Sequence, residues 1–316
     1  MKADKKKVAL IGTGMVGMSY AYALLNRGVC DELLLIDINK ERAKGEAMDL
    51  QHGLAFAPTS MKIYAGEYSD CGDADIVVIC AGVAQKPGES RLALLQRNAD
   101  VFCTIVDPVI KSGFSGIFLV ATNPVDIMTR IVYDLSGFPS FKVIGSGTTL
   151  DTARLRYLIG NYFSLDSRNV HAYVIGEHGD SEFVPWSQAM LATKPVLELC
   201  EEIDACELAK MNEISEEVRT SAQVIIAAKK ATYYGIGMSL VRITSAILGD
   251  ENSVLTVSSF LNGEYDEKNV FVGVPSIVNR NGVKKILELK LSEEEKQKLH
   301  NSCETLRKSY NELKLK

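Results

Sequence analysis

A glycine-rich turn near the start of the chain constrains the fold more than any other feature. Residues 8–12 form an apolar run of strand length, and Gly12, Gly14 and Gly17 follow in GTGMVG at the start of a helical pattern. The first glycine permits a tight turn, the second lets the backbone approach a pyrophosphate, and the third lets the helix pack against the sheet. The helix N-terminus then faces the phosphates with its partial positive charge. The motif predicts a dinucleotide site.

Asp37 adds the second half of this prediction. It ends the next apolar run, 32–37, and lies 20 residues after Gly17. A carboxylate at this point can hydrogen-bond the adenosine ribose, and its charge would repel a 2′-phosphate. We therefore expect NAD rather than NADP. Asp37 could also cap the helix after residue 39, a role compatible with the first.

Short apolar runs alternate with amphipathic stretches through the first 145 residues. Further strands are expected at 62–66, 75–82, 116–122 and 141–145. Strands that are apolar on both faces and separated by helices are typical of a parallel sheet covered on both sides. The sequence predicts an α/β fold, with a Rossmann-type doubly wound parallel sheet in a domain spanning 1–145.

The pattern changes after residue 146. Helices are expected at 148–163, 205–232, 238–249 and 292–314, with extended segments near 168–175, 253–263 and 269–282. This mixture predicts an α+β substrate or catalytic domain spanning 146–316. No low-complexity linker separates the two parts, so we expect a broad interface with the ligand between them.

Composition argues against several classes of function. The 316 residues carry a net charge of −5, which gives no basic field for nucleic acid. No apolar run approaches the roughly 20 residues of a membrane span. The basic start precedes too short an apolar run for a signal peptide. The seven cysteines include no C-x-x-C pair and no metal-ligand spacing, so we expect free thiols, no metal and a cytoplasmic location.

The acid–base chemistry is expected around one of only four histidines. His178 lies between two glycines in GEHGDS, where a tight turn can present an imidazole. Asp151 and Arg154 lie three residues apart on a predicted helix, so they share a face. The alternative for this group is a surface ion pair and a hydrogen-bonded loop histidine.

Two more segments follow predicted strands. The first, AGVAQKPGESR over 81–91, has the composition of a loop that closes over a site and ends at Arg91, although a solvated connection fits equally well. The second, TNPVDI over 122–127, offers Asn123 near the carboxyl edge of the sheet, where open α/β folds bind ligands.

Taken together, these motifs resemble the lactate/malate dehydrogenase family, on its L-lactate branch of bacterial allosteric type. The likeness covers nearly the whole chain and includes GTGMVG, AGVAQKPGESR, TNPVDI, GSGTTLDTARLR, GEHGDS and KKATYYGIGMSL in the family's order. It implies that His178 is the acid/base and Asp151 its orienting partner. It also implies that Arg154 anchors the substrate carboxylate and that Arg91 polarises the carbonyl.

The resemblance implies further contacts. Asn123 and Thr232 match substrate contacts. Besides the glycines, Asp37 and Asn123, the matching cofactor contacts are Val16, Arg42, Tyr68, Gly82, Val83, Thr104, Thr122 and Ser146. Gln85 stands where the malate branch carries an arginine. Because a neutral amide cannot pair with a second carboxylate, pyruvate and L-lactate are favoured over oxaloacetate.

Regulation and assembly are implied by the resemblance alone. Arg156 and His171 match positions that bind fructose 1,6-bisphosphate across a subunit interface in a homotetramer. The alternative is that Arg156 is an exposed helix residue and His171 a strand residue packed against it. For the whole chain, two other functions stay open: malate or another 2-hydroxy acid dehydrogenase, and a catalytically silent NAD-binding protein. Retention of four groups argues together against the silent protein: His178, Asp151, Arg91 and Arg154.

Overall fold

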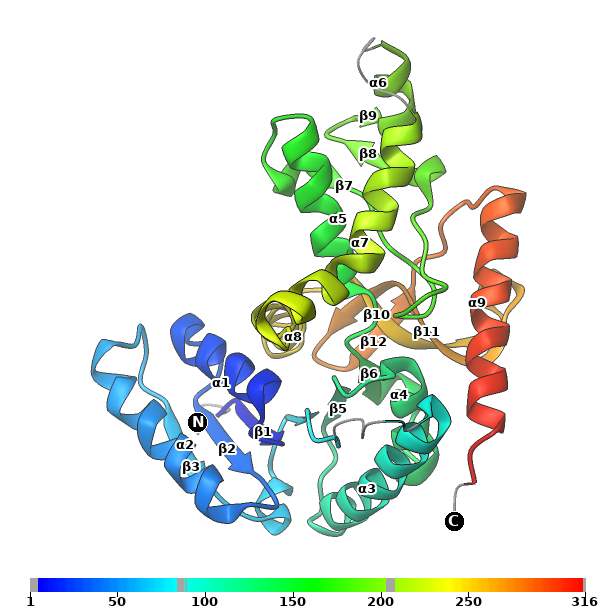
Figure 1. Ribbon diagram of the computed structural model, residues 1–316. Helices are drawn as coiled ribbons and strands as arrows, with labels where there is room; N and C mark the ends of the chain where they lie inside the picture. Colours follow the sequence, from blue (N-terminus) through cyan, green and yellow to red (C-terminus); the bar gives the residue numbers. More distant parts are fainter. Residues whose placement is uncertain (1–4, 84–87, 89, 203–207, 315–316) are drawn as a thin grey trace.

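The computed structural model describes residues 5–83, 88, 90–202 and 208–314, and its centre is one long sheet. The described strands run in the order β12-β11-β10-β6-β5-β4-β1-β2-β3 (Figure 1). Their bounds are β1 (Lys7–Ile11), β2 (Glu32–Ile36), β3 (Lys62–Ala65), β4 (Ile76–Ile79), β5 (Ile117–Val120), β6 (Val143–Gly145), β10 (Ser253–Asn262), β11 (Lys268–Asn279) and β12 (Gly282–Ile286). Strands β1 to β6 pair in parallel, so the predicted doubly wound sheet is confirmed.

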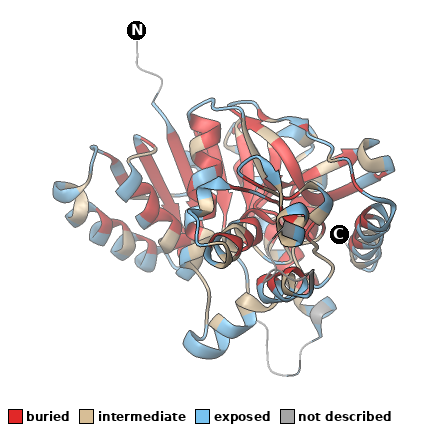
Figure 2. Cartoon of the chain, turned by 90° about the horizontal axis from the view of Figure 1, so that it is seen from above, coloured by how far each residue is buried: buried red, intermediate tan, exposed pale blue. Residues whose placement is uncertain are grey.

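Helices cover both faces of this sheet because its strand residues alternate between two apolar layers. Val8 and Leu10 of β1 pack with helices α1 and α8, whereas Ala9 and Ile11 pack in the layer of α3, α4 and α9. The buried strands lie between helices whose outer faces are exposed (Figure 2). These helices are α1 (Met15–Arg27), α2 (Lys40–His52), α3 (Arg91–Lys111), α4 (Val125–Ser136), α8 (Tyr234–Leu248) and α9 (Glu293–Asn311).

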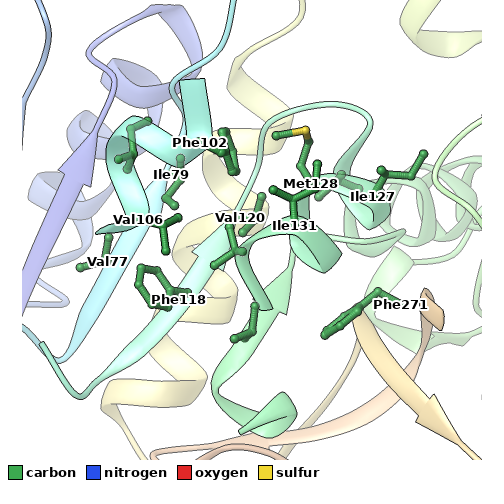
Figure 3. Close-up of a cluster of buried hydrophobic side chains, with 14 of the residues drawn as sticks. Val77, Ile79, Phe102, Val106, Phe118, Val120, Ile127, Met128, Ile131 and Phe271 are labelled. Carbon is green, nitrogen blue, oxygen red and sulfur yellow. The ribbon is translucent and has the colours of Figure 1, made fainter. Parts of the chain in front are cut away.

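The second of these layers fixes the segment that leads into the site. Phe118 and Val120 of β5 pack against Phe102 of α3 and Met128 of α4, and Phe271 of β11 closes the same cluster (Figure 3). All five side chains are at most 2% exposed. Because α4 begins five residues after β5 ends, this packing holds the turn between them at the carboxyl edge of the sheet.

The remaining elements form a third apolar cluster. Helices α5 (Thr149–Tyr162), α6 (Val196–Glu202) and α7 (Leu208–Lys229) pack with a small sheet of β7 (Val170–His171), β8 (Met190–Leu191) and β9 (Lys194–Pro195). The large sheet nevertheless continues past the predicted boundary at 145, since Ser258 of β10 pairs antiparallel with Gly145 of β6. The two-domain division at 145 stays a prediction.

Three expectations need correction. Strand β12 was not predicted, because its GVKKI pattern with two exposed lysines is that of a charged edge strand rather than an apolar run. The helix expected to reach 232 ends at Lys229, leaving Thr232 in the connection to α8. The expectation that every cysteine is a free thiol is wrong for Cys200, which is disulfide-bonded; Cys30, Cys71, Cys80, Cys103 and Cys303 are free.

No described helix is long and apolar enough to cross a membrane.

Candidate active site

The glycine turn has the geometry that a dinucleotide requires. Gly12 has φ of 98°, and a Cβ there would lie 2.5 Å from the backbone nitrogen of Ala81. A Cβ on Gly17 would lie 2.0 Å from the carbonyl oxygen of Gly12, so the helix packs too closely for any side chain. A Cβ on Gly14, in contrast, would meet no described atom within 4 Å. Gly14 therefore leaves open space at the helix N-terminus, which suits the approach of a pyrophosphate.

Asp37 lies directly beside this turn. One carboxylate oxygen accepts hydrogen bonds from the backbone nitrogen and hydroxyl of Thr13, at 2.8 and 2.9 Å, and the other accepts from the backbone nitrogen of Asn39 at 2.9 Å. Burial opposes ionisation, but these bonds and the charge of Arg42 more than offset it and lower the pKa of Asp37. Asp37 is thus a fixed anion beside the phosphate turn.

Two of the expected cofactor contacts, Arg42 and Tyr68, lie near Asp37. Arg42 is on α2 and pairs loosely with Glu46 at 3.6 Å. The pKa of Tyr68 is raised, mainly by burial and to a smaller extent by the charge of Asp37. Val16, by contrast, is in the first turn of α1, and Thr104 lies on α3, where its hydroxyl donates to the carbonyl of Val101.

Four further predicted cofactor residues lie just beyond the carboxyl ends of adjacent strands. Gly82 and Val83 follow β4, Thr122 follows β5 and Ser146 follows β6. The Thr122 hydroxyl donates to the carbonyl of Ala81 at 2.7 Å, and the Ser146 nitrogen donates to Val120 at 2.8 Å. Parallel order places these ends on one edge, next to the point where the strand order reverses between β1 and β4. This edge is the expected nucleotide crevice.

Sequence analysis did not identify Asn98, which supports that edge. Its side-chain oxygen accepts the backbone nitrogen of Val83 at 2.9 Å, and the residue is 2% exposed on α3. Nothing in its helical sequence context distinguishes it from a solvated asparagine, so its role is visible only in the tertiary structure.

His178, Asp151 and Arg154 form one buried constellation. Asp151 lies in the first turn of α5 and is 1% exposed. One of its oxygens lies 2.6 Å from Nδ1 of His178, and the other accepts from the Arg154 guanidinium at 2.6 Å. The alternative of a surface ion pair is therefore wrong, because the Asp151 carboxylate is buried. Because a carboxylate can only accept, Nδ1 of His178 carries the proton, which leaves Nε2 for a substrate.

The protonation states of this group follow from burial and charge. Burial disfavours the imidazolium, but the charge and hydrogen bond of Asp151 outweigh it and raise the pKa of His178 to about 9. Burial likewise opposes ionisation of Asp151, and His178 and Arg154 together lower its pKa. At neutral pH the pair is an imidazolium beside a carboxylate, which is a proton donor held in a fixed orientation.

Two further acids beside His178 were not predicted. Glu182 lies 3.9 Å from Nδ1 of His178, and burial followed by the charge of Asp151 raises its pKa to about 8. Asp126 of α4 accepts the backbone nitrogen of His178 at 2.9 Å. Possible ligand atoms of Asp151, His178 and Glu182 lie within 4.8 Å of one another, so the expected absence of a metal stays a prediction.

Only some of the other predicted site residues have described side chains. Gln85 lies outside the described residues, and Arg91 begins α3 but its side chain is not described. Asn123 occupies the turn between β5 and α4, and Thr232 is half-buried before α8. Nε of Arg156 donates to the carbonyl of Ala172 at 3.1 Å, and His171, the residue before Ala172, is exposed on β7.

This combination of a phosphate-binding turn, an anion beside it and a buried proton donor defines an NAD-dependent oxidoreductase. The chain matches the family model described as lactate/malate dehydrogenase, NAD binding domain, over residues 6–145, and the alpha/beta C-terminal domain model of the same family over 148–315. It belongs to the lactate/malate dehydrogenase family.

Similar proteins align with this chain over nearly its full length. The chain is 56% identical to an L-lactate dehydrogenase of Geobacillus sp., covering 95% of this chain and 94% of the relative. It is 52% identical to L-lactate dehydrogenase 2 of Bacillus anthracis, covering 98% of each. A lactate dehydrogenase from a Medee basin deep-sea metagenome superposes with a TM-score of 0.96 at 53% identity, covering 98% of both chains. The ligand-bound minor L-lactate dehydrogenase of Enterococcus mundtii gives 0.97 at 46% identity, covering 99% of this chain and 100% of that one.

Substitution of Asp37 tests the cofactor site. Asp37→Ser should weaken NADH binding and improve NADPH binding relative to it, because the fixed negative charge no longer repels a 2′-phosphate. We expect the ratio of the two dissociation constants to change by about tenfold or more, or ~1.4 kcal/mol. Quenching of protein fluorescence by each cofactor measures both constants. Asp49→Ser, which removes an exposed carboxylate from α2, is the control. Equal loss for both cofactors would show that Asp37 does not face the ribose.

Proposed function

We propose that this protein catalyses reversible hydride transfer between NADH and pyruvate to give L-lactate. The observation that carries the proposal is the buried pair of Asp151 and His178 with Arg154 on the same carboxylate. NAD binding alone requires none of these three groups, whereas reduction of a 2-oxo acid requires a proton donor and a cation for the substrate carboxylate. The names of the similar L-lactate dehydrogenases support the same substrate.

The proposed roles follow from the atoms available. NADH, when bound, supplies the hydride. The imidazolium of His178 gives a proton from Nε2 to the ketone oxygen and, in the reverse direction, removes it from the alcohol. Asp151 holds the ring through Nδ1 and stabilises its positive charge. His178 thus donates the proton in ketone reduction and accepts it in alcohol oxidation, and Asp151 holds the ring in the same orientation for both.

Arg154 is the proposed anchor of the substrate carboxylate. One guanidinium nitrogen is bonded to Asp151, and the planar fork leaves further N–H donors for a second carboxylate. The side chain is 14% exposed, so this ion pair would form in a partly desolvated site. Arg91, Asn123 and Thr232 complete the proposed substrate contacts by resemblance, with Arg91 stabilising developing charge on the carbonyl oxygen. The same resemblance supports the cofactor contacts.

The pH profile tests the acid. Pyruvate reduction requires protonated His178, so kcat/KM should be level below pH about 9 and fall tenfold per pH unit above it. Asp151→Asn removes the charge that raises the pKa of His178. The alkaline limb of the kcat/KM profile, where the rate falls, should therefore move down by about one pH unit or more. Stopped-flow NADH oxidation gives both profiles, with the exposed Asp166→Asn as control. A limb unchanged by Asp151→Asn would refute the assigned pair, as would near-normal turnover by His178→Ala.

Gln85 is the proposed determinant of substrate choice. Gln85→Arg should raise kcat/KM for oxaloacetate relative to pyruvate by at least about thirtyfold, ~2 kcal/mol, because a second carboxylate then gains an ionic partner. NADH oxidation with each substrate measures the ratio in the wild type and the variant, and Gln297→Arg on the exposed face of α9 is the control. Wild-type preference for oxaloacetate would place the chain on the malate branch. No turnover of either substrate would favour a silent NAD-binding protein.

We propose a fructose 1,6-bisphosphate site at Arg156 and His171. The Arg156 guanidinium lies 5.2 Å from the ring centre of Tyr173, and its Nε donates to the carbonyl of Ala172, the residue after exposed His171. Two such basic groups suit a phosphate, and a bisphosphate bridging subunits would favour one quaternary state. The resemblance that suggests this site also suggests a homotetramer in the cytoplasm, in glycolysis and fermentation.

Removal of both basic groups tests the regulatory site. Arg156→Gln combined with His171→Gln should abolish activation by fructose 1,6-bisphosphate and leave turnover at saturating pyruvate within about twofold, since neither group reaches the reacting atoms. Pyruvate saturation curves with and without the bisphosphate measure this, and Arg280→Gln is the control. Activation that persists in the double variant would exclude the site.

A further inference from the structure

The turn that carries His178 also places a second carboxyl group beside its ring. Glu182 follows His178 by four residues, and its backbone nitrogen donates to the carbonyl of Gly179 at 3.2 Å. Ile175 and Phe183 close the turn with two reciprocal backbone hydrogen bonds of 3.0 Å each. Backbone bonds therefore fix where Glu182 lies, whatever charge its side chain carries.

The side chain of Glu182 is buried against the catalytic pair. It is 5% exposed, and one of its oxygens lies 3.9 Å from Nδ1 of His178. Side-chain atoms of Glu182, His178 and Asp151 lie within 4.8 Å of one another. Asp151 has a second cationic partner in Arg154, whereas the ion pair of Glu182 among the described residues is with His178. Two buried carboxyl groups thus face one imidazole ring, and ionisation of both is costly unless the ring is positively charged.

Glu182 also borders a cavity that reaches the surface. The cavity has a volume of about 180 Å³ and lies between this turn, α7 and α9. Trp186, whose Nε1 donates to the hydroxyl of Ser215 at 3.1 Å, forms part of its wall. Arg219 and Lys298 at its mouth have side chains that are 39% and 50% exposed. A polar cavity of this size admits water, so Glu182 can exchange its proton with solvent.

We propose that Glu182 is a positioning residue that acts through His178: it ionises as the pH rises, and its charge then holds the imidazolium. This rests on the proposed function in that the imidazolium is the proton donor for pyruvate. Two anions beside one imidazolium keep its proton to a higher pH than Asp151 alone would keep it. The protein would therefore reduce its substrate over a wider pH range.

The order in which the two groups titrate agrees with this role. Burial, followed by the charge of Asp151, raises the pKa of Glu182 to about 8, although the charges of His178 and Arg154 oppose the shift. The charge of Glu182 in turn helps to raise the pKa of His178 to about 9, after the contribution of Asp151. Glu182 thus loses its proton first, and its charge is present at the pH where the imidazolium would otherwise be lost.

Other charged groups that face His178 or Glu182 come from four elements. They are Arg154 of α5, Arg219 and Glu216 of α7, Lys298 of α9 and Asp126 of α4. Arg219 is paired with Glu216 at 2.5 Å, and Lys298 with Glu294 at 2.7 Å, so each of these two cations already has an acidic partner. Asp126 acts on His178 in the same direction as Glu182 but more weakly.

Glutamine at this position removes the charge and keeps the shape. In Glu182→Gln the alkaline limb of kcat/KM for pyruvate should move down by about half a pH unit or more, because the imidazolium loses one of its two nearest anions. Half a unit lowers kcat/KM by about threefold near pH 10, relative to the ratio of variant to wild type near pH 6, where Glu182 carries little charge. Stopped-flow NADH oxidation measures both profiles. Glu213→Gln, an exposed acid on α7, should leave the limb in place.

A purely structural role predicts a different result. It would lower kcat/KM by the same factor at every pH in Glu182→Gln and would leave the position of the limb unchanged. Glu182→Ala removes the whole side chain and should show the same shifted limb as the glutamine variant, with circular dichroism to establish that each variant is folded. An unmoved limb in folded Glu182→Gln, or an equal shift in Glu213→Gln, would overturn the proposal.

A substrate-independent measurement keeps this test separate from the proposed function. The rate at which diethyl pyrocarbonate modifies His178, followed by mass spectrometry of its peptide against pH, reports the pKa of the imidazole without turnover. We expect that pKa to fall in Glu182→Gln and to stay in Glu213→Gln. If the wild type does not turn over pyruvate, this shift still supports the action of Glu182 on His178, and its absence refutes that action.

Discussion

The buried carboxylate of Asp151 is the constraint on which the site depends. An ion that is 1% exposed is stable only where charged hydrogen-bond partners replace water, and Arg154 and His178 occupy one oxygen each. Its place in the first turn of α5 adds the favourable end of the helix dipole. Both partners must therefore stay close to α5, so one desolvated anion fixes the imidazole of His178 and the guanidinium of Arg154, the proposed proton donor and carboxylate anchor, relative to each other.

The large sheet determines where this group lies. The ends of β4, β5 and β6 bring the cofactor edge together, and β10 and β11 extend the same sheet toward the catalytic loop. Gly176, with φ of 101°, pairs with Gly273 of β11, where a Cβ would lie 2.9 Å from the Gly176 carbonyl oxygen. The close approach of these two glycines anchors the loop before His178. The cofactor edge and the loop that carries His178 are thus held by two different parts of one sheet.

Much of this arrangement could be predicted from the sequence, because its signals are local or repeat a known spacing. The glycine turn, Asp37 and the parallel strands depend on short-range patterns. The grouping of Asp151 and Arg154 follows from helix periodicity. Asp126, Glu182 and Asn98 could not be found this way, since burial distinguishes them from solvated residues and burial is a tertiary property. Strand β12 was not predicted because its two exposed lysines make its sequence resemble a polar loop. Only its pairing in the tertiary structure shows that it is an edge strand.

The three acids around His178 differ in protonation because their surroundings differ. Asp151 has two cationic partners and a lowered pKa, Asp126 has one backbone donor and a pKa of about 6, and Glu182 faces Asp151 with a pKa of about 8. Asp126 and Asp151 oppose the positive charges of the imidazolium and Arg154, while burial and the charge of Asp151 favour the protonated form of Glu182. A substrate carboxylate bound at Arg154 would add one negative charge and favour the imidazolium further, so substrate binding and retention of the catalytic proton would reinforce each other.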